Sequence, residues 1–230
     1  MPNIAFNFAQ PGESNACGAY ALTAALIALP SVASVNYPIT LCHSTPRTRM
    51  LTPPVTINGN EVGHALAGKI YKITGDLDIA GSLGSMSVAY EDGPNLQNSP
   101  SALAYVAKQF GLTVTVNIIK DANTRASTCQ TMASLLLQDF DDEVRRCMLS
   151  ATVNGEGGNG VLNGVDYAAP NSDEVHLLCV IQGKSMHWLT RGTNGFYDPG
   201  DATINAWTIA ADGTMTGGGY TFTGIWIVLK

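Results

Sequence analysis

The chain has 230 residues, a length that suits one well-packed domain or at most two small ones. Charged residues make up only 13% of the sequence and the formal net charge is −6, which argues against nucleic acid or an anionic membrane as the main partner. No basic segment followed by an apolar run opens the chain, so we expect no cleavable signal peptide, and the longest apolar stretch, residues 19–29, is too short to span a bilayer.

The first predicted element is a helix over residues 16–29, which is rich in Ala and Leu and is ended by Pro30. Ser14 and Asn15 are good N-caps, so we place Cys17 in the first turn. Backbone N–H groups there lack intrahelical acceptors and the helix dipole favours a thiolate, which makes a cysteine nucleophilic. The same amides suit an oxyanion formed by attack of the sulfur. Cys17 is therefore a candidate nucleophile, and the alternative is a small buried hydrophobic residue.

Two helices and irregular segments are predicted next. Residues 31–59 are rich in Pro and Thr and indicate an extended excursion with short strands. Residues 75–98 indicate a loop. Between them, residues 61–74 predict an amphipathic helix whose apolar face consists of Val62, Leu66, Ile70 and Ile73.

A further helix begins at Ser99-Pro100, an N-cap followed by proline at the first position, and ends at Gly111. Residues 112–119 alternate and are β-branched, which predicts a strand. Residues 127–150 have a helical pattern, and we interpret the acidic residues within it as a solvated face rather than a metal or acid–base site. In the helix that begins at Ser99-Pro100 and ends at Gly111, the apolar side consists of Leu103, Val106, Ala107 and Phe110.

Residues 154–174 form a loop rich in Gly, Asn and Asp. A phosphate-binding loop needs its glycines between a strand and a helix, and no helix signal follows, so nucleotide binding is not favoured. We expect a lid beside a cleft.

The chain is β-patterned from residue 175 onward, with strands expected over 175–182, 186–191, 204–210 and 220–229. Gly192-Thr193-Asn194-Gly195 is a strong hairpin turn that leads into Phe196-Tyr197-Asp198. No repeat or linker is visible. The sequence therefore predicts one α+β domain over residues 1–230, with N-terminal helices packed on a C-terminal antiparallel sheet.

The hairpin turn brings two chemically useful side chains near each other. His187 begins one predicted strand and Asp198 ends the next, eleven positions later. Across the turn the carboxylate can orient the imidazole, which in turn can pair with Cys17 as general base and acid. The structural alternatives are a hydrogen-bonded core histidine for His187 and a turn residue before Pro199 for Asp198.

Metal binding is not favoured. His176 and Cys179 lie three apart on a predicted strand and so face opposite sides, and Cys42 and His43 are adjacent, so no pair has good zinc spacing. We expect no metal and no cofactor, and we expect His64 and His43 to be structural or exposed. An odd number of scattered cysteines does not resemble a disulfide framework, which predicts reduced thiols and synthesis in a cytosol. A protein delivered to another cell by a secretion machinery would look the same. The cysteines are Cys17, Cys42, Cys129, Cys147 and Cys179.

A family resemblance rests on motifs at the two ends of the chain. The order of these motifs, with 170 positions between the cysteine and the histidine, resembles that of the papain-like cysteine peptidases, above all the bacteriocin-leader-processing branch and related bacterial effector proteases. The motifs are Gln10, Cys17-Gly18 at a helix start, His187-Trp188 on a strand and Tyr197-Asp198-Pro199-Gly200 after a hairpin.

The resemblance implies a papain-like fold, with Cys17 as nucleophile, His187 as base and acid, and Asp198 as the residue that orients His187. It also implies that the Gln10 side chain donates to the oxyanion. Gln10 precedes Cys17 by seven positions where the family usually has six, so Asn15 or Asn7 is an alternative donor.

The expected reaction is a thiol-dependent acyl transfer on a protein or peptide substrate. With a backbone amide and water it is a peptidase, which the motifs resemble most. With a glutamine side chain it is a deamidase, and with an amine acceptor a transglutaminase, because the same three residues serve all three reactions. A non-catalytic papain-like interaction module is the alternative from another class.

Overall fold

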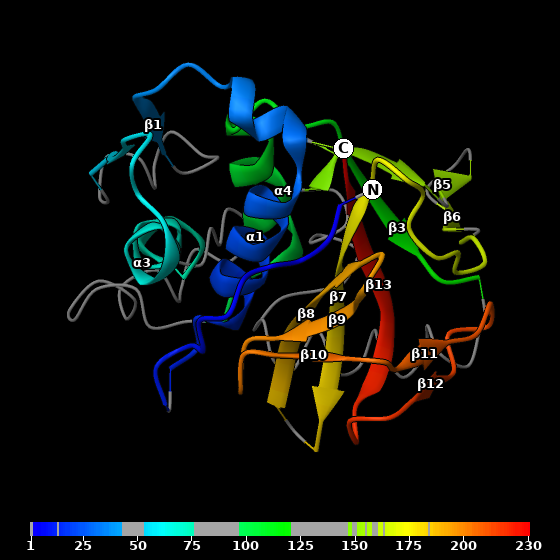
Figure 1. Cartoon of the computed structure of the whole chain (residues 1–230). Helices are drawn as coiled ribbons and strands as arrows, with labels where there is room; N and C mark the ends of the chain where they lie inside the picture. Colours follow the sequence, from blue (N-terminus) through cyan, green and yellow to red (C-terminus); the bar gives the residue numbers. More distant parts are fainter. Residues whose placement is uncertain are drawn as a thin grey trace, which may run out of the picture.

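A central β-sheet organises the computed structural model, which describes residues 2–12, 14–42, 53–75, 97–120, 147–148, 151–154, 156–157, 161–162, 164–183 and 185–230. Within these residues, seven strands pair in the order β10-β9-β8-β7-β13-β3-β4 (Figure 1). The strands are β3 (Val114–Ile118), β4 (Thr152–Asn154), β7 (Val175–Gln182), β8 (Ser185–Gly192), β9 (Gly195–Asp198), β10 (Thr203–Asn205) and β13 (Thr221–Leu229).

The sheet is mixed, so the prediction of an antiparallel sheet confined to the C-terminal part was wrong. Strands β7 to β10 and β13 pair antiparallel, and β13 also pairs antiparallel with β3. Strand β4 pairs parallel with β3, with Thr115 opposite Thr152. A parallel pair needs a long crossover connection, and the separation in sequence between Ile118, the end of β3, and Thr152, the start of β4, is long enough for one.

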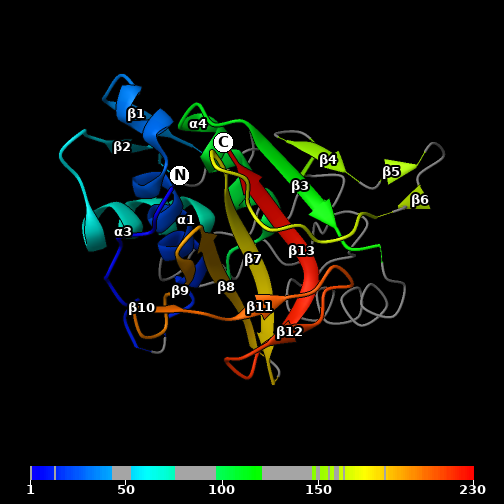
Figure 2. The ribbon, with the colours of Figure 1, turned by 45° about the vertical axis from the view of Figure 1, so that its right-hand side comes forward.

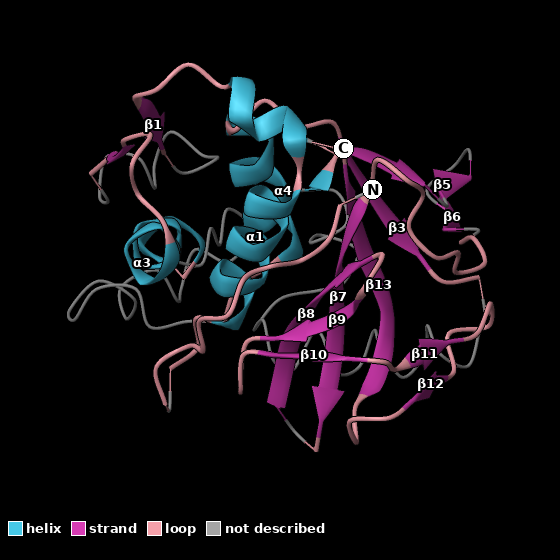
Figure 3. Cartoon of the chain, in the orientation of Figure 1, coloured by secondary structure: helices cyan, strands magenta, loops and turns pink. Residues whose placement is uncertain are grey.

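The helices lie on one face of this sheet. Helices α1 (Cys17–Ala28) and α4 (Pro100–Gln109) pack on the sheet, and α3 (Gly63–Thr74) covers α1 from outside, as Figures 1 and 3 show and Figure 2 confirms from a turned view. The α+β class is therefore correct. None of the described helices is long and apolar enough to cross a membrane.

Short elements fill the segments between the main ones. A 3-10 turn, η1 (Pro30–Ser34), precedes the antiparallel pair β1 (Ile39–Leu41) and β2 (Val55–Ile57), as expected for this excursion. The predicted loop 154–174 contains the pair β5 (Glu156–Gly157) and β6 (Val161–Leu162). The predicted strand 204–210 is divided between β10 and β11 (Thr208–Ile209), which pairs with β12 (Met215–Thr216).

The helix predictions from apolar spacing agree with the structure in most details. Ser99 caps α4 by accepting a hydrogen bond from the Ala102 amide at 3.2 Å, and the four apolar residues predicted on this helix are buried. On α3 the exception is Val62, which is 63% exposed because it is the extended N-cap residue and Gly63 begins the helix. The predicted helix 127–150 and loop 75–98 fall almost wholly outside the described residues.

The core has layers on both faces of the sheet. Successive residues of a strand point to opposite faces, so Leu177 and Cys179 of β7 join the core under the helices. Leu178 and Val180 join a second apolar cluster on the other face, together with Trp226 of β13. The sheet is thus covered on both sides.

The start of α1 is capped from elsewhere in the chain. Its N-cap position is Ala16, so the prediction that Ser14 and Asn15 cap the helix was wrong, and Cys17 is the first helical residue. The Asn98 side chain lies against this turn and its Oδ1 accepts a hydrogen bond from the Ala19 amide at 2.8 Å. This bond replaces the one that a local N-cap side chain makes to the third helical amide.

Asn98 also joins α1 to β8. Its backbone oxygen accepts a hydrogen bond from Trp188 Nε1 at 2.9 Å, and both Asn98 and Trp188 are fully buried. The approach requires Gly18, because a Cβ at this position would lie 2.5 Å from Asn98 Oδ1. The helix start and the strand that carries His187 are therefore held together by one residue.

Replacing Asn98 with alanine should lower the free energy of unfolding by about 2 kcal/mol, because it removes the cap of Ala19 and leaves a small cavity. Denaturant unfolding of both proteins measures the effect. Asn58→Ala, which removes an exposed hydrogen bond to Glu61, is the control and should change stability by less than about 0.5 kcal/mol. Equal effects of the two substitutions would contradict the role of Asn98.

Candidate active site

The Cys17 side chain is buried at the first position of α1, with 3% of its surface exposed. The first hydrogen bond of the helix runs from the Tyr20 amide to the Ala16 oxygen at 3.1 Å. The amides of Cys17 and Gly18 therefore have no acceptor within the helix. Donors of this kind next to a sulfur suit a negatively charged oxygen on the carbon that the sulfur attacks.

His187 and Asp198 are in contact. Strands β8 and β9 pair with Thr190 opposite Tyr197, so His187 lies just beyond the paired part of the hairpin and Asp198 is its diagonal neighbour. The distance between His187 Nε2 and Asp198 Oδ1 is 2.8 Å. The Gly192–Gly195 turn thus places the two side chains together in the way that the spacing predicts.

Asp198 receives two further hydrogen bonds. The Gly200 amide donates to Oδ1 at 2.8 Å, and the Tyr220 hydroxyl donates to Oδ2 at 2.8 Å. Burial alone would raise the pKa of this carboxyl, but the hydrogen bonds and the charge of His187 outweigh burial and hold it below its usual value. Asp198 is therefore an ionised carboxylate in a fixed orientation.

His187 has two partners that stabilise the positive charge of its protonated ring. Burial would lower its pKa, but the Asp198 hydrogen bond, with the Cys17 sulfur as a second hydrogen-bonding and charged partner, raises the pKa to about 9. Because Asp198 occupies Nε2, Nδ1 is the ring nitrogen left for Cys17. The imidazole thus links the sulfur to the carboxylate, and its protonated form is strongly favoured at neutral pH.

Gln10 lies beside this group. Its amide donates to the oxygen of Pro199, the residue after Asp198, at 2.8 Å. Its side-chain Nε2 donates to the Ser14 oxygen over a long 3.4 Å, and its Oε1 is buried without a hydrogen-bond partner among the described residues. Of the alternatives, Asn7 is exposed and Asn15 is half-buried.

Tyr220 is a member of the site that the sequence interpretation missed. Besides its bond to Asp198, its ring stacks on His187 with centroids 5.4 Å apart and an angle of 9° between the planes. The only signal in the sequence was the preceding Gly217-Gly218-Gly219 run. All three glycines have positive φ angles of 107°, 69° and 67°, which glycine adopts readily, and a Cβ at Gly218 would lie 2.7 Å from the Trp207 ring.

The other described histidines and cysteines lie apart from one another. His64 is exposed, and its Nδ1 makes a 2.6 Å hydrogen bond with the Tyr20 hydroxyl, whereas His43 lies outside the described residues. His176 and Cys179 face opposite sides of the sheet. Within the described part of the chain, no three His, Cys, Asp or Glu side chains are close enough to share a metal ion.

A cysteine at a helix start, an imidazole that contacts its sulfur and a carboxylate that holds the imidazole form the arrangement of a thiol-dependent hydrolase. The chain matches the family model of invasion plasmid antigen J, cysteine protease, over residues 9–230. It therefore belongs to this family of bacterial effector cysteine proteases in the papain-like superfamily, which confirms the resemblance and the enzyme class. Neither a curated protein nor a solved structure matches the chain.

The raised pKa of His187 predicts a measurable titration. A ¹⁵N NMR titration of its ring should have a midpoint near pH 9, and Asp198→Asn should move it to lower pH because a partner of the imidazolium is lost. Asp201→Asn, which changes an exposed carboxylate on the same turn, should leave the midpoint unchanged. An unshifted midpoint in Asp198→Asn would contradict the electrostatic role of Asp198.

The raised pKa of His187 also makes the free energy of unfolding depend on pH. Because the folded-state pKa lies above the ordinary value of 6.5, the folded protein binds this proton more tightly than the unfolded chain. The resulting stabilisation is complete below about pH 6.5 and is lost as the pH rises through about 9. Denaturant unfolding of the wild type across this pH range, compared with His187→Ala, separates this contribution from that of other groups.

Proposed function

We propose that the protein is a papain-like cysteine peptidase with a triad of Cys17, His187 and Asp198. The observation that carries the proposal is the double engagement of one imidazole, with Asp198 Oδ1 at 2.8 Å from Nε2 and the Cys17 sulfur as the other partner. Membership in a cysteine protease family supports the reaction class.

In the first half of the reaction, the Cys17 sulfur attacks the carbonyl carbon of a peptide bond and the carbonyl oxygen becomes an oxyanion. His187, which holds the proton of the thiol, donates it to the nitrogen of the leaving amine. The carbon–nitrogen bond then breaks, and a thioester between Cys17 and the acyl part of the substrate remains. Asp198 keeps the ring oriented and stabilises its positive charge.

In the second half, water attacks the thioester and His187 accepts one of its protons. The carbon–sulfur bond breaks, the carboxylic acid product leaves, and the sulfur and imidazole return to their starting pair. An amine in place of water would give transamidation by the same steps, so the acceptor that reaches the thioester decides the product.

We assign the oxyanion donors to the Cys17 amide and the Gln10 side chain. The Gln10 backbone is tied to Pro199 next to Asp198, and the present bond from Nε2 to the Ser14 oxygen is long at 3.4 Å. A bond of that length is weak, so the amide can turn toward a substrate oxygen at little cost. The exposed Asn7 has no such link to Asp198.

We further propose that residues 1–230 form one papain-like domain. The main described strands form one sheet, and the described helices share a core with it. The substrate is a protein or peptide. Membership in an effector family supports synthesis in a bacterial cytosol and delivery into a host cell.

Thiol labelling tests the proposed nucleophile. Exposure alone predicts that the half-exposed Cys42 reacts before the buried Cys17. A catalytic Cys17 should instead react with iodoacetamide at least about tenfold faster than Cys42, because the neighbouring His187 can take the thiol proton as the sulfur attacks. Mass spectrometry of tryptic peptides gives both rates in one sample.

The preference for Cys17 should disappear in His187→Ala and persist in Asp201→Asn. Cys17→Ala should abolish turnover while changing the free energy of unfolding by no more than about 2 kcal/mol. Turnover by Cys17→Ala, or faster labelling of Cys42 in the wild type, would refute the assignment.

The product identifies the reaction. Candidate host proteins incubated with the wild type and with Cys17→Ala should show a new cleavage only with the wild type, visible as a new chain terminus by mass spectrometry. A mass gain of about 1 Da on a glutamine would instead indicate a deamidase, and a covalent crosslink a transglutaminase. Either result would overturn the peptidase assignment but would leave the assignment of Cys17 as the nucleophile in place.

A further inference from the structure

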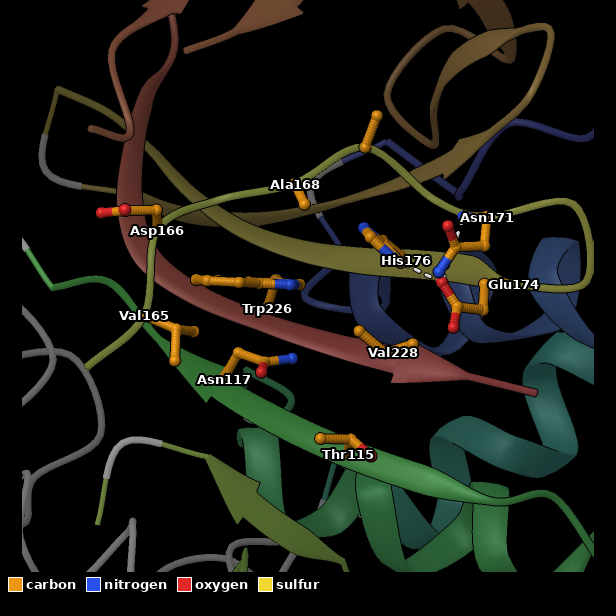
Figure 4. A pocket seen from close by; sticks show the side chains of 11 residues that line it. Thr115, Asn117, Val165, Asp166, Ala168, Asn171, Glu174, His176, Trp226 and Val228 are labelled. Carbon is orange, nitrogen blue, oxygen red and sulfur yellow. Dashed lines mark hydrogen bonds and ion pairs between the residues drawn. The ribbon is translucent and has the colours of Figure 1, made fainter. Parts of the chain in front are cut away.

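A cavity of about 350 Å³ lies on the face of the sheet turned away from α1 and α4. Its floor consists of side chains from three strands, among them His176 of β7, Trp226 of β13 and Asn117 of β3, and the segment 165–174 forms its wall (Figure 4). This volume lies within the range of roughly 300 to 1,000 Å³ that small-molecule sites occupy.

The cavity is separate from the proposed triad. The strand neighbour of His187 is Val180, which follows His176 by four residues on β7. At a rise of about 3.3 Å per residue, the two positions are about 13 Å apart along the strand. None of Cys17, His187 and Asp198 lines the cavity.

His176 is a buried polar group that Glu174 approaches but does not fully satisfy. Its side chain is 3% exposed, and neither ring nitrogen has a hydrogen-bond partner among the described residues. The nearest carboxylate oxygen, Glu174 Oε2, is 3.9 Å from Nε2, beyond hydrogen-bond reach. Buried polar groups in native proteins nearly always have partners, so an unsatisfied one that faces a cavity indicates an ordered water or a bound ligand there.

His176 is neutral in this setting. Burial lowers its pKa to about 4, an effect that the charge of Glu174 opposes and that of Arg191 reinforces. A neutral imidazole has one nitrogen that accepts a hydrogen bond and one that donates. The ring therefore offers an acceptor to a ligand that carries N–H groups.

The charge of the lining is negative. Glu174 and Asp166 belong to it, and no lysine or arginine does among the described residues. Figure 4 shows Glu174 close to His176, and Asp166 at the edge of the cavity. Arg191 is engaged elsewhere, since it donates to the Tyr167 hydroxyl at 3.0 Å and lies over the Phe196 ring.

The floor and wall also provide apolar surface. Trp226 and Val228 rise from β13, and Ala168 lies on the wall opposite them. An indole attracts cations as well as apolar groups. Carboxylates bind planar nitrogen cations with two parallel hydrogen bonds.

We propose that this cavity is a binding site for a small organic cation with a planar amidinium or guanidinium head and an apolar body. Glu174 pairs with the head, the free nitrogen of His176 accepts one of its N–H groups, and the Trp226 and Val228 side chains pack against the body. The site goes beyond the proposed peptidase function and does not depend on it.

Benzamidine is a suitable probe, because it has this head and body and its neutral analogue benzamide has nearly the same shape. Calorimetric titration of the full chain, in the Cys17→Ala variant to exclude any effect of the thiol, should give a dissociation constant for benzamidine at least about tenfold lower than for benzamide. The indole N–H signal of Trp226, assigned with Trp226→Phe, should shift on addition of benzamidine.

Three substitutions locate the binding. Glu174→Gln should weaken the binding of benzamidine at least about tenfold and leave the affinity for benzamide unchanged. The matched control is Asp173→Asn, since Asp173 is the neighbouring carboxylate but is half-exposed and paired with Lys230 at 2.6 Å; it should change affinity less than about twofold. Ala168→Leu, which fills the cavity from its exposed wall and removes no polar group, should block binding.

Each alternative outcome would overturn the proposal. Equal affinities for benzamidine and benzamide would mean that the cavity is only an apolar hollow. If Glu174→Gln unfolds at the same temperature as the parent and binds benzamidine with unchanged affinity, Glu174 does not pair with the cation. A crystal grown with benzamidine that holds only ordered water between His176 and Glu174 would make the cavity a hydration site.

Discussion

The contact between the start of α1 and strand β8 is the constraint on which the proposed active site depends. Asn98 accepts from the Ala19 amide on one side and from Trp188 Nε1 on the other, and the Thr190 hydroxyl donates to the Ala21 oxygen at 2.7 Å. These bonds are buried, where the loss of one partner leaves the other unsatisfied. They hold the helix that carries Cys17 in a single register against the strand that carries His187.

Buried charge can be kept at the site because its hydrogen-bonding capacity is used. A buried ion pair repays its desolvation only when further hydrogen bonds satisfy both partners. Asp198 has three donors, from His187, Gly200 and Tyr220, and the Tyr220 ring also covers the imidazole. The glycine run before Tyr220 lets the chain pass closely over Trp207, so backbone conformation and charge stabilisation are linked at this point.

Local signals predicted the parts of this architecture that depend on local physics. The turn at Gly192–Gly195 indicated that His187 and Asp198 approach each other, and the Ser99-Pro100 start of α4 followed from capping rules. The prediction of the α1 cap was wrong because the capping group, Asn98, is far away in sequence. Tyr220 was missed for the same reason, since a tyrosine in a β-pattern is usually a core residue. The parallel strand β4 is likewise a non-local pairing that no short pattern encodes.

The position of β13 in the sheet has a consequence for when the enzyme becomes active. Strand β13 (residues 221–229) follows the other described strands in sequence but lies between β7 and β3, in the interior of the sheet. While these residues are still in the ribosome, β7 lacks its neighbour, and Tyr220 and the hairpin with His187 and Asp198 have no completed sheet to rest on. The proposed triad is therefore complete only once residues 221–229 have joined the sheet, so the proposed activity depends on the folding of the whole sheet.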